Sequence, residues 1–126
     1  MAYLAKLPAR DVVLIVEDHP LILLTAAALL EDAGMDTVVA ADADAALAIL
    51  DARDDIHAVF TDVAMPGSMD GVALAQLIRK RWPAIQLVVT SAGQLPDDAT
   101  LPCGVPFLRK PHDYAKVIDE LRGDGP

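Results

Sequence analysis

The sequence predicts an α/β fold, an open parallel sheet with helices packed on both of its faces. Five short apolar runs alternate along the chain with segments whose apolar residues recur at helical spacing, and such alternation is typical of a parallel sheet. The first run, Val12–Val16, is apolar without a break, as expected for a strand covered on both faces. A chain of 126 residues suffices for one domain of this kind.

Five predicted strands define the sheet. They are Val12–Val16, Thr37–Ala40, Ala58–Thr61, Ile85–Thr90 and Val105–Leu108. Because crossover connections between parallel strands are right-handed, only a few arrangements of these strands are possible. We expect the flavodoxin-like order 2-1-3-4-5, which is common among doubly wound domains of this size.

Two predicted helices lie in the first half of the chain. The apolar residues of the first fall at positions i, i+4, i+7 and i+8, which are Ile22, Ala26, Leu29 and Leu30. Pro20 suits the first turn of this helix, and Gly34 suits its end. The second helix is weaker and covers Ala45–Leu50, with Asp42 or Asp44 as its N-cap.

Two further helices are predicted in the second half. One begins near Asp70 and ends before Pro83, because proline cannot continue a helix. The other has apolar residues at i, i+3, i+4 and i+7 over Tyr114–Leu121. Between them, Gly93–Gly104 contains two prolines and two glycines. We therefore expect the fourth helix of the fold, which belongs there, to be short or degraded.

Charge and composition argue against several classes of protein. The net charge of −9 repels phosphate backbones and anionic lipids, which disfavours direct binding of nucleic acid or membrane surfaces. The longest apolar stretch, Pro20–Leu30, is too short to cross a bilayer. The single cysteine, Cys103, has no partner for an internal disulfide or a zinc site, and a reducing cytoplasm suits it.

Polar side chains stand at the ends of four predicted strands, on the edge where an open α/β sheet binds its ligands. In chain order they are Glu17, Asp18, Asp62, Thr90, Ser91 and Lys110. The carboxyl ends of parallel strands meet at one edge. We therefore expect three carboxylates, a hydroxyl group and a lysine to converge there.

These residue types together indicate metal binding and phosphoryl transfer. Carboxylates packed together repel one another, and a hard divalent cation relieves the repulsion. Oxygen ligands with open water positions suit Mg²⁺, which usually takes one or two protein carboxylates together with phosphate and water. A carboxylate such as Asp62 can attack phosphorus and form an acyl phosphate. Lys110 can supply a point charge to a phosphoryl oxygen.

Each residue also has an ordinary structural role when it is taken alone. Glu17 and Asp18 suit the cap of the first helix, and Asp70-Gly71 is a turn or helix-start signal. Lys110 by itself is a solvated surface charge. The occurrence of all of them in order at one sheet edge makes coincidence improbable.

Five short motifs are spaced along the chain. They are Val12–Asp18, Phe60–Pro66, Met69–Gly71, Leu87–Ala92 and Phe107–Pro111. In this order they resemble the response-regulator receiver domain, over roughly residues 11–121. A match of several spaced motifs is far more specific than any single motif.

The resemblance implies a metal-assisted phosphoacceptor site. By this resemblance, Asp62 takes a phosphoryl group, and the carboxylates of Asp18 and Asp62 hold Mg²⁺ together with the backbone carbonyl of Ala64. Glu17 binds the ion through water or assists. Such a domain catalyses only its own phosphoryl transfer and dephosphorylation, and it is not an enzyme in the ordinary sense.

The resemblance also implies a switch. Ser91 is the switch hydroxyl because the family places it directly before a small residue, with Thr90 as the alternative. Lys110 pairs with the phosphoryl group, and the Lys110-Pro111 bond is expected to be cis. Phe107 occupies the position of the switch aromatic, although a core strand residue is the ordinary interpretation there.

The resemblance further implies partners. A histidine kinase or a histidine phosphotransfer protein donates the phosphoryl group, and output goes through an unknown downstream protein, a homodimer or use as a phosphate sink. We expect a single cytoplasmic receiver domain over residues 1–126, with its core at about 11–121 and loose ends at 1–9 and 122–126. That leaves no room for a separate output domain. Gly67 and Ser68 make the loop beside Asp62 one residue longer than is commonest in the family.

Three other interpretations are open at this point. A degenerate receiver that acts as a phosphorylation-independent interaction module usually lacks an acid or the lysine, whereas Glu17, Asp18, Asp62 and Lys110 are all present. A flavin-binding module of the same fold needs a phosphate-cradling loop after the first strand, where this chain is acidic. A haloacid-type phosphatase has a second aspartate two residues after the nucleophile, where this chain has Ala64.

Overall fold

Five parallel strands form one sheet in the order β2-β1-β3-β4-β5, as the sequence predicts. The computed structural model describes residues 12–63, 70–91, 101, 104–109 and 114–122. The strands are β1 (Val12–Val16), β2 (Asp36–Ala40), β3 (Ile56–Asp62), β4 (Gln86–Ser91) and β5 (Phe107–Arg109). Every neighbouring pair is parallel, so all five carboxyl ends lie at the same edge of the sheet.

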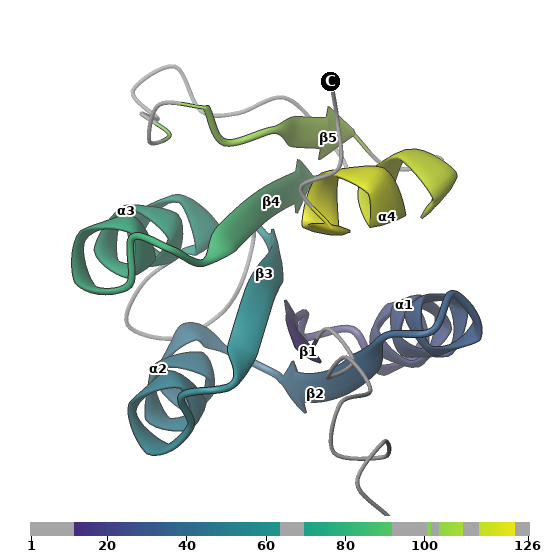
Figure 1. The fold of residues 1–126 in the computed structure, drawn as a ribbon, viewed down its shortest axis with the longest axis horizontal. Coiled ribbons are helices and arrows are strands. Elements are labelled where there is room, and N and C mark those ends of the chain that lie inside the picture. The colour runs from purple at the N-terminus through teal and green to yellow at the C-terminus, as the bar shows by residue number, and fades with distance from the viewer. Residues whose placement is uncertain (1–11, 64–69, 92–100, 102–103, 110–113, 123–126) are drawn as a thin grey trace, which may run out of the picture.

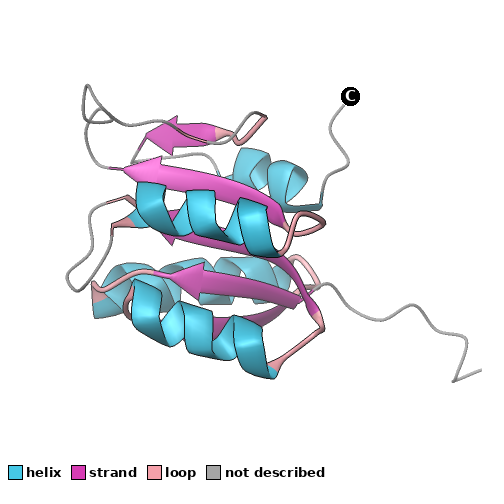
Figure 2. Ribbon diagram, turned by 90° about the vertical axis from the view of Figure 1, so that its left-hand side faces the viewer, coloured by secondary structure: helices cyan, strands magenta, loops and turns pink. Residues whose placement is uncertain are grey.

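Four helices among the described residues cover both faces of this sheet (Figures 1 and 2). They are α1 (Pro20–Asp32), α2 (Ala43–Ala52), α3 (Gly71–Arg81) and α4 (Tyr114–Arg122). Helices α2 and α3 pack on one face, and α1 and α4 pack on the other. The doubly wound fold expected from the sequence is therefore confirmed.

The core consists of two apolar clusters separated by the sheet. Successive side chains of a strand point to opposite faces, so Leu14 and Val59 join the cluster under α2 and α3, whereas Ile15 and Phe60 join the cluster under α1 and α4. Strand β1 is buried along its whole length. Its unbroken apolar sequence follows from this central position.

The helices begin at caps that satisfy their free amide groups. The carboxylate of Asp42 accepts a hydrogen bond from the Ala45 N–H at 2.8 Å, so Asp42 rather than Asp44 is the cap of α2. At α3 the carboxylate of Asp70 accepts from the Ala73 N–H at 2.9 Å. An N-cap of this kind contributes about 1 kcal/mol to stability.

Some predicted boundaries differ from the observed ones. Strand β5 begins at Phe107, two residues after the predicted start. Pro106 has no N–H to donate to a ladder, and its carbonyl accepts from the Val89 N–H at 3.0 Å. Strand β3 begins earlier than predicted, at Ile56, and the pairing with β1 carries an irregularity between Val12 and Val13. Of the four apolar residues at helical spacing in α1, Ala26 and Leu30 are buried, whereas Leu29 is exposed.

Parts of the sequence prediction fall outside the described residues. These parts are most of Gly93–Gly104 and the predicted loose ends at 1–9 and 123–126. The prediction also placed Arg122 in a loose end, which is wrong, because Arg122 is the last residue of α4. In the part of the chain that the structure describes, no helix has the length and apolar character needed to span a membrane.

The two faces of α1 give a direct test of this packing. Leu30 is completely buried in the cluster between α1 and the sheet, whereas Leu24 is 66% exposed on the same helix. We expect Leu30→Ala to lower the free energy of unfolding by about 2–5 kcal/mol. Leu24→Ala should change it by no more than about 0.5 kcal/mol. Chemical denaturation measures both values, and equal losses would contradict the assigned faces of α1.

Candidate functional site

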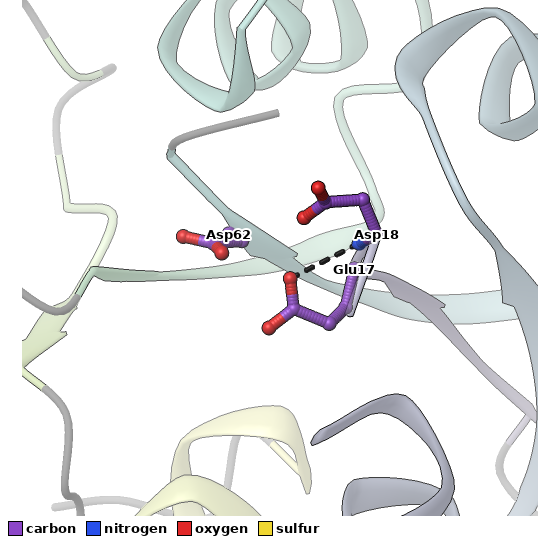
Figure 3. Close-up of side chains that lie close together, drawn as sticks. All are labelled: Glu17, Asp18 and Asp62. Carbon is purple, nitrogen blue, oxygen red and sulfur yellow. Dashed lines mark hydrogen bonds between the residues drawn. The ribbon is translucent and has the colours of Figure 1, made fainter. Parts of the chain in front are cut away.

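Three carboxylates meet at the carboxyl ends of two neighbouring strands. Glu17 and Asp18 directly follow β1, and Asp62 is the last residue of β3. The two strands pair with Val16 opposite Thr61. The next residues along each strand, Glu17 and Asp62, are therefore level with one another. Figure 3 shows the three side chains together at this edge.

Two hydrogen bonds to backbone groups hold Glu17 in place. Its N–H donates to the carbonyl of Ala40 at 3.0 Å, which extends the β1–β2 ladder by one step. Its Oε2 accepts from the Asp18 N–H at 3.0 Å (Figure 3). With only 4% of its surface exposed, Glu17 has little freedom to turn away from the site.

Strand β4, which pairs with β3 on the side away from β1, fixes Asp62. This residue pairs with Thr90 of β4, and the N–H of Val63 donates to the Thr90 carbonyl at 2.8 Å. Asp62 is 7% exposed, whereas Asp18 is open to solvent. The site therefore has two buried acids at its base and one exposed acid at its mouth.

The arrangement suits a hard cation. One carboxylate oxygen from each of the three acids lies within 4.8 Å of the other two. Two negative charges at that separation repel by roughly 3 kcal/mol at an effective dielectric constant of about 20. Oxygen donors alone favour Mg²⁺, Mn²⁺ or Ca²⁺ over softer metals. The donor set thus fits the metal site expected from the sequence.

Glu17 and Asp18 do not have the helix-cap role that the sequence suggested for them. The residue that caps α1 is His19, whose Nδ1 accepts from the Ile22 N–H at 3.5 Å, and Pro20 occupies the first turn. Neither acid is the N-cap of α1. Asp70, by contrast, has the helix-cap role considered for it.

The two candidate hydroxyl groups lie on successive residues at the end of β4. Thr90 and Ser91 are both buried. Strand alternation puts Thr90 on the face of Val88, under α1 and α4, and Ser91 on the face of Val89, under α2 and α3. Ser91 pairs with Arg109 of β5, the residue before Lys110. The two hydroxyls are therefore distinguishable by substitution.

Several predicted residues lie outside the described residues. They are Ala64, Lys110, Pro111, Cys103 and the loop residues Gly67 and Ser68. Phe107 is described, and it packs partly buried against the cluster under α2 and α3.

The sequence prediction missed a second apolar face on α1. Leu21 is 68% exposed, and the exposed residues Leu24, Ala28 and Leu29 follow it on the same side of the helix. We call these four residues the α1 stripe. Their spacing of i, i+3, i+7 and i+8 was a readable signal, but α1 is apolar on nearly all sides and its core face could not be told from its outer face.

Comparison with known proteins gives one family. A family model described as "Response regulator receiver domain" matches residues 13–122. The chain is 40% identical over 114 residues to a "Putative response regulator NtrX-like" of Rickettsia bellii. It is 39% identical over 84 residues to the "Nitrogen assimilation regulatory protein NtrX" of Azorhizobium caulinodans. These matches cover 87% and 66% of this chain but 24% and 18% of the two relatives, so the chain spans about a quarter of their length or less.

Solved structures agree with that result. A response regulator receiver protein from Pseudomonas putida is 27% identical, with a TM-score of 0.80 and coverage of 93% of this chain and 99% of that one. The receiver domain of the hybrid histidine kinase CckA is 29% identical, with a TM-score of 0.73 and coverage of 90% and 97%. A receiver protein from Sinorhizobium medicae, at 23% identity, a TM-score of 0.82 and coverage of 90% and 93%, supports the fold alone.

The acidic cluster predicts site-specific binding of divalent cations. We expect substoichiometric Mn²⁺ to broaden the NMR amide signals of Glu17, Asp18 and Asp62 selectively, because a paramagnetic ion acts over short distances. Asp18→Asn should weaken the binding by tenfold or more, on the order of losses seen when metal sites lose a supporting group. Asp54→Asn makes the same chemical change at an exposed position before β3 and serves as the control. Equal weakening in both variants would rule out the predicted site.

Proposed function

The chain belongs to the response regulator receiver domain family, and from that premise we propose that Asp62 is the phosphoacceptor of a two-component phosphorelay. The family consists of signalling domains rather than enzymes in the ordinary sense. The observation that carries the proposal is the convergence of Glu17, Asp18 and Asp62 at one sheet edge. A partner histidine kinase or histidine phosphotransfer protein is the proposed donor.

The proposed reaction is a transfer between two side chains. A carboxylate oxygen of Asp62 attacks the phosphorus of a phosphohistidine on the donor. The new O–P bond forms as the N–P bond breaks, and the imidazole leaves with the electron pair and then takes up a proton. The product on this chain is an acyl phosphate. Asp62 is suited to the attack because it ends a strand that lies between β1 and β4, and because it pairs with Thr90 of β4.

Mg²⁺ is the proposed cofactor. When bound, it supplies positive charge that offsets both the repulsion among the acids and the charge of an incoming phosphoryl group. Asp18 and Asp62 would hold it directly, together with the backbone carbonyl of Ala64, and Glu17 would assist. Lys110 is proposed to give a second positive charge to the phosphoryl oxygens.

The proposed switch responds to the charge of the phosphoryl group. Phosphorylation adds about two negative charges to the edge of the sheet. Ser91, or in its place Thr90, donates its hydroxyl to a phosphoryl oxygen. Phe107, which packs partly buried beside β4, moves further into the core. The change biases an equilibrium between two existing conformations.

A docking surface for the phosphodonor follows from the α1 stripe. Helix α1 begins two residues after Asp18, and from Pro20 to Leu30 it carries no charged residue in a chain of net charge −9. A partner that is itself acidic meets the least electrostatic repulsion at an uncharged surface of this kind. A contiguous set of exposed leucines is typical of an interaction surface. We propose that the donor packs an apolar helical face on this stripe, which brings its phosphohistidine toward Asp62.

The proposal also covers the cellular compartment of the domain and the way in which it passes on its signal. We propose that residues 11–121 act as a single receiver domain in the cytoplasm, where a reducing environment suits the lone Cys103. Output goes through contacts with a downstream protein, through a homodimer, or by draining phosphate from a kinase. The alternative of a phosphorylation-independent interaction module is not favoured, because the three acids are present and lie together.

Incubation with a small phosphodonor tests the phosphoacceptor directly. With Mg²⁺ and acetyl phosphate, we expect the intact mass to rise by one phosphoryl group, stable in acid and labile in base. Asp62→Ala should abolish the gain, whereas Asp54→Ala should leave it unchanged. Intact-protein mass spectrometry measures all three. An unmodified wild type, or an Asp62→Ala variant that is labelled normally, would refute the assignment.

The switch hydroxyl is tested with two single variants of the phosphorylated protein. We expect Ser91→Ala to take up phosphate but to lose a charge-assisted hydrogen bond of roughly 1.5–3 kcal/mol, so that the equilibrium constant for the switched conformation falls at least about tenfold. Thr90→Val should have a smaller effect. NMR shift changes of β4 and β5 on phosphorylation report the population. The reverse ranking would make Thr90 the switch residue.

Two kinds of donor separate docking on the α1 stripe from chemistry at Asp62. We expect the double variant Leu21→Ser/Leu24→Ser to slow transfer from a phosphorylated phosphotransfer protein by about tenfold, which corresponds to roughly 1.4 kcal/mol of lost contact. Labelling by acetyl phosphate should stay within about twofold, because that donor is too small to use the stripe. A loss of the same size with both donors would argue against a docking role.

A further inference from the structure

Helix α3 begins in contact with the backbone of the phosphoacceptor strand. Its first residue is Gly71, which is buried. The N–H of Gly71 donates to the carbonyl of Val63, the residue after Asp62, at 2.8 Å. The end of β3 and the start of α3 are therefore bonded to each other across the intervening loop.

No side chain fits at position 71 without movement of this backbone. A Cβ atom on Gly71 would overlap the carbonyl oxygen of Asp62 and would lie 2.7 Å from the Asp62 carbonyl carbon and 2.8 Å from the Cα of Val63. All three are backbone atoms, which cannot turn aside as the end of a side chain can. The glycines with positive φ among the described residues are Gly34 and Gly104. Close approach, rather than an unusual backbone conformation, thus requires glycine at position 71.

The contact bears on Asp62 because the residue that follows it, Val63, is hydrogen-bonded on both sides. The Val63 N–H donates to the Thr90 carbonyl of β4 at 2.8 Å, while the Val63 carbonyl accepts from Gly71 of α3. The peptide that joins Asp62 to Val63 lies between β4 and α3, because its N–H bonds to Thr90 and its carbonyl oxygen lies against Gly71. A shift of the α3 start would move this peptide, and with it the Cα–Cβ bond that aims the Asp62 carboxylate.

We propose that Gly71 is a positioning residue for Asp62, and that the missing side chain at position 71 sets where the carboxylate stands relative to Glu17 and Asp18. The inference rests on the proposed phosphoacceptor function of Asp62. Gly71 touches neither metal nor phosphate. It acts through the backbone of Asp62 and Val63, which must stay within a fraction of an ångström for in-line attack.

The test compares Gly71→Ala with Gly34→Ala. Gly34 ends α1 with a φ of +95°, and a Cβ there meets nothing within 4 Å. Alanine at position 34 therefore strains the backbone and lowers stability, but far from Asp62. We expect Gly71→Ala, measured while folded and at saturating Mg²⁺, to lower the rate constant of labelling by acetyl phosphate by about 10- to 100-fold. Gly34→Ala should stay within about twofold of the wild type.

Each outcome decides a different claim. A folded Gly71→Ala variant labelled within twofold of the wild-type rate would overturn the positioning role. An unlabelled wild type would instead overturn the proposed phosphoacceptor function. If Gly71→Ala does not fold, a Mg²⁺ titration of the wild-type protein followed by NMR decides. The Gly71 and Val63 amide signals should then shift with the same affinity as Asp62 while Gly34 does not, and an unresponsive Gly71 signal would overturn the inference.

Discussion

The molecule depends on one constraint, the placement of three carboxylates at the ends of adjacent parallel strands. Glu17, Asp18 and Asp62 bring an oxygen each to within 4.8 Å of the others, and two of the three side chains are buried. Such a cluster is unfavourable by itself because like charges repel in a medium less polar than water. A bound cation of the proposed kind would relieve this repulsion, and the same crowding of charge would make the site sensitive to the charge of the proposed phosphoryl group.

The rest of the fold keeps these acids in place. Strand β2 fixes Glu17 through the Ala40 carbonyl, and β4 fixes the end of β3 through the Thr90 carbonyl. Apolar clusters on both faces of the sheet anchor these strands. Helix α3 then approaches the backbone of Asp62 so closely that only glycine fits at position 71. Backbone hydrogen bonds and buried apolar surface thus oppose the repulsion between the clustered acids.

Sequence periodicity was sufficient for the strand order and for the meeting of Glu17, Asp18 and Asp62 at the sheet edge, because both follow from alternation of strands and helices. Local signals also narrowed the cap of α2 to Asp42 or Asp44 and placed the start of α3 near Asp70, where the caps are Asp42 and Asp70. Sequence periodicity failed where tertiary contacts decide. In α1 the apolar spacing included the exposed Leu29, and it did not distinguish the exposed α1 stripe from the buried face. The Gly71-Asp62 contact joins segments that meet only in three dimensions, so a turn signal was all that the sequence offered there.

The most direct test measures the free energy of unfolding of the wild type and of Asp62→Asn as Mg²⁺ is added. Without Mg²⁺, the variant should be the more stable of the two, because one of three clustered charges is gone. As the Mg²⁺ concentration rises above the dissociation constant, the free energy of unfolding of the wild type should increase by about 1.4 kcal/mol for each tenfold increase in concentration. The difference in stability between the two proteins should then narrow or change sign. A wild type that is indifferent to Mg²⁺ and no less stable than Asp62→Asn would contradict the account.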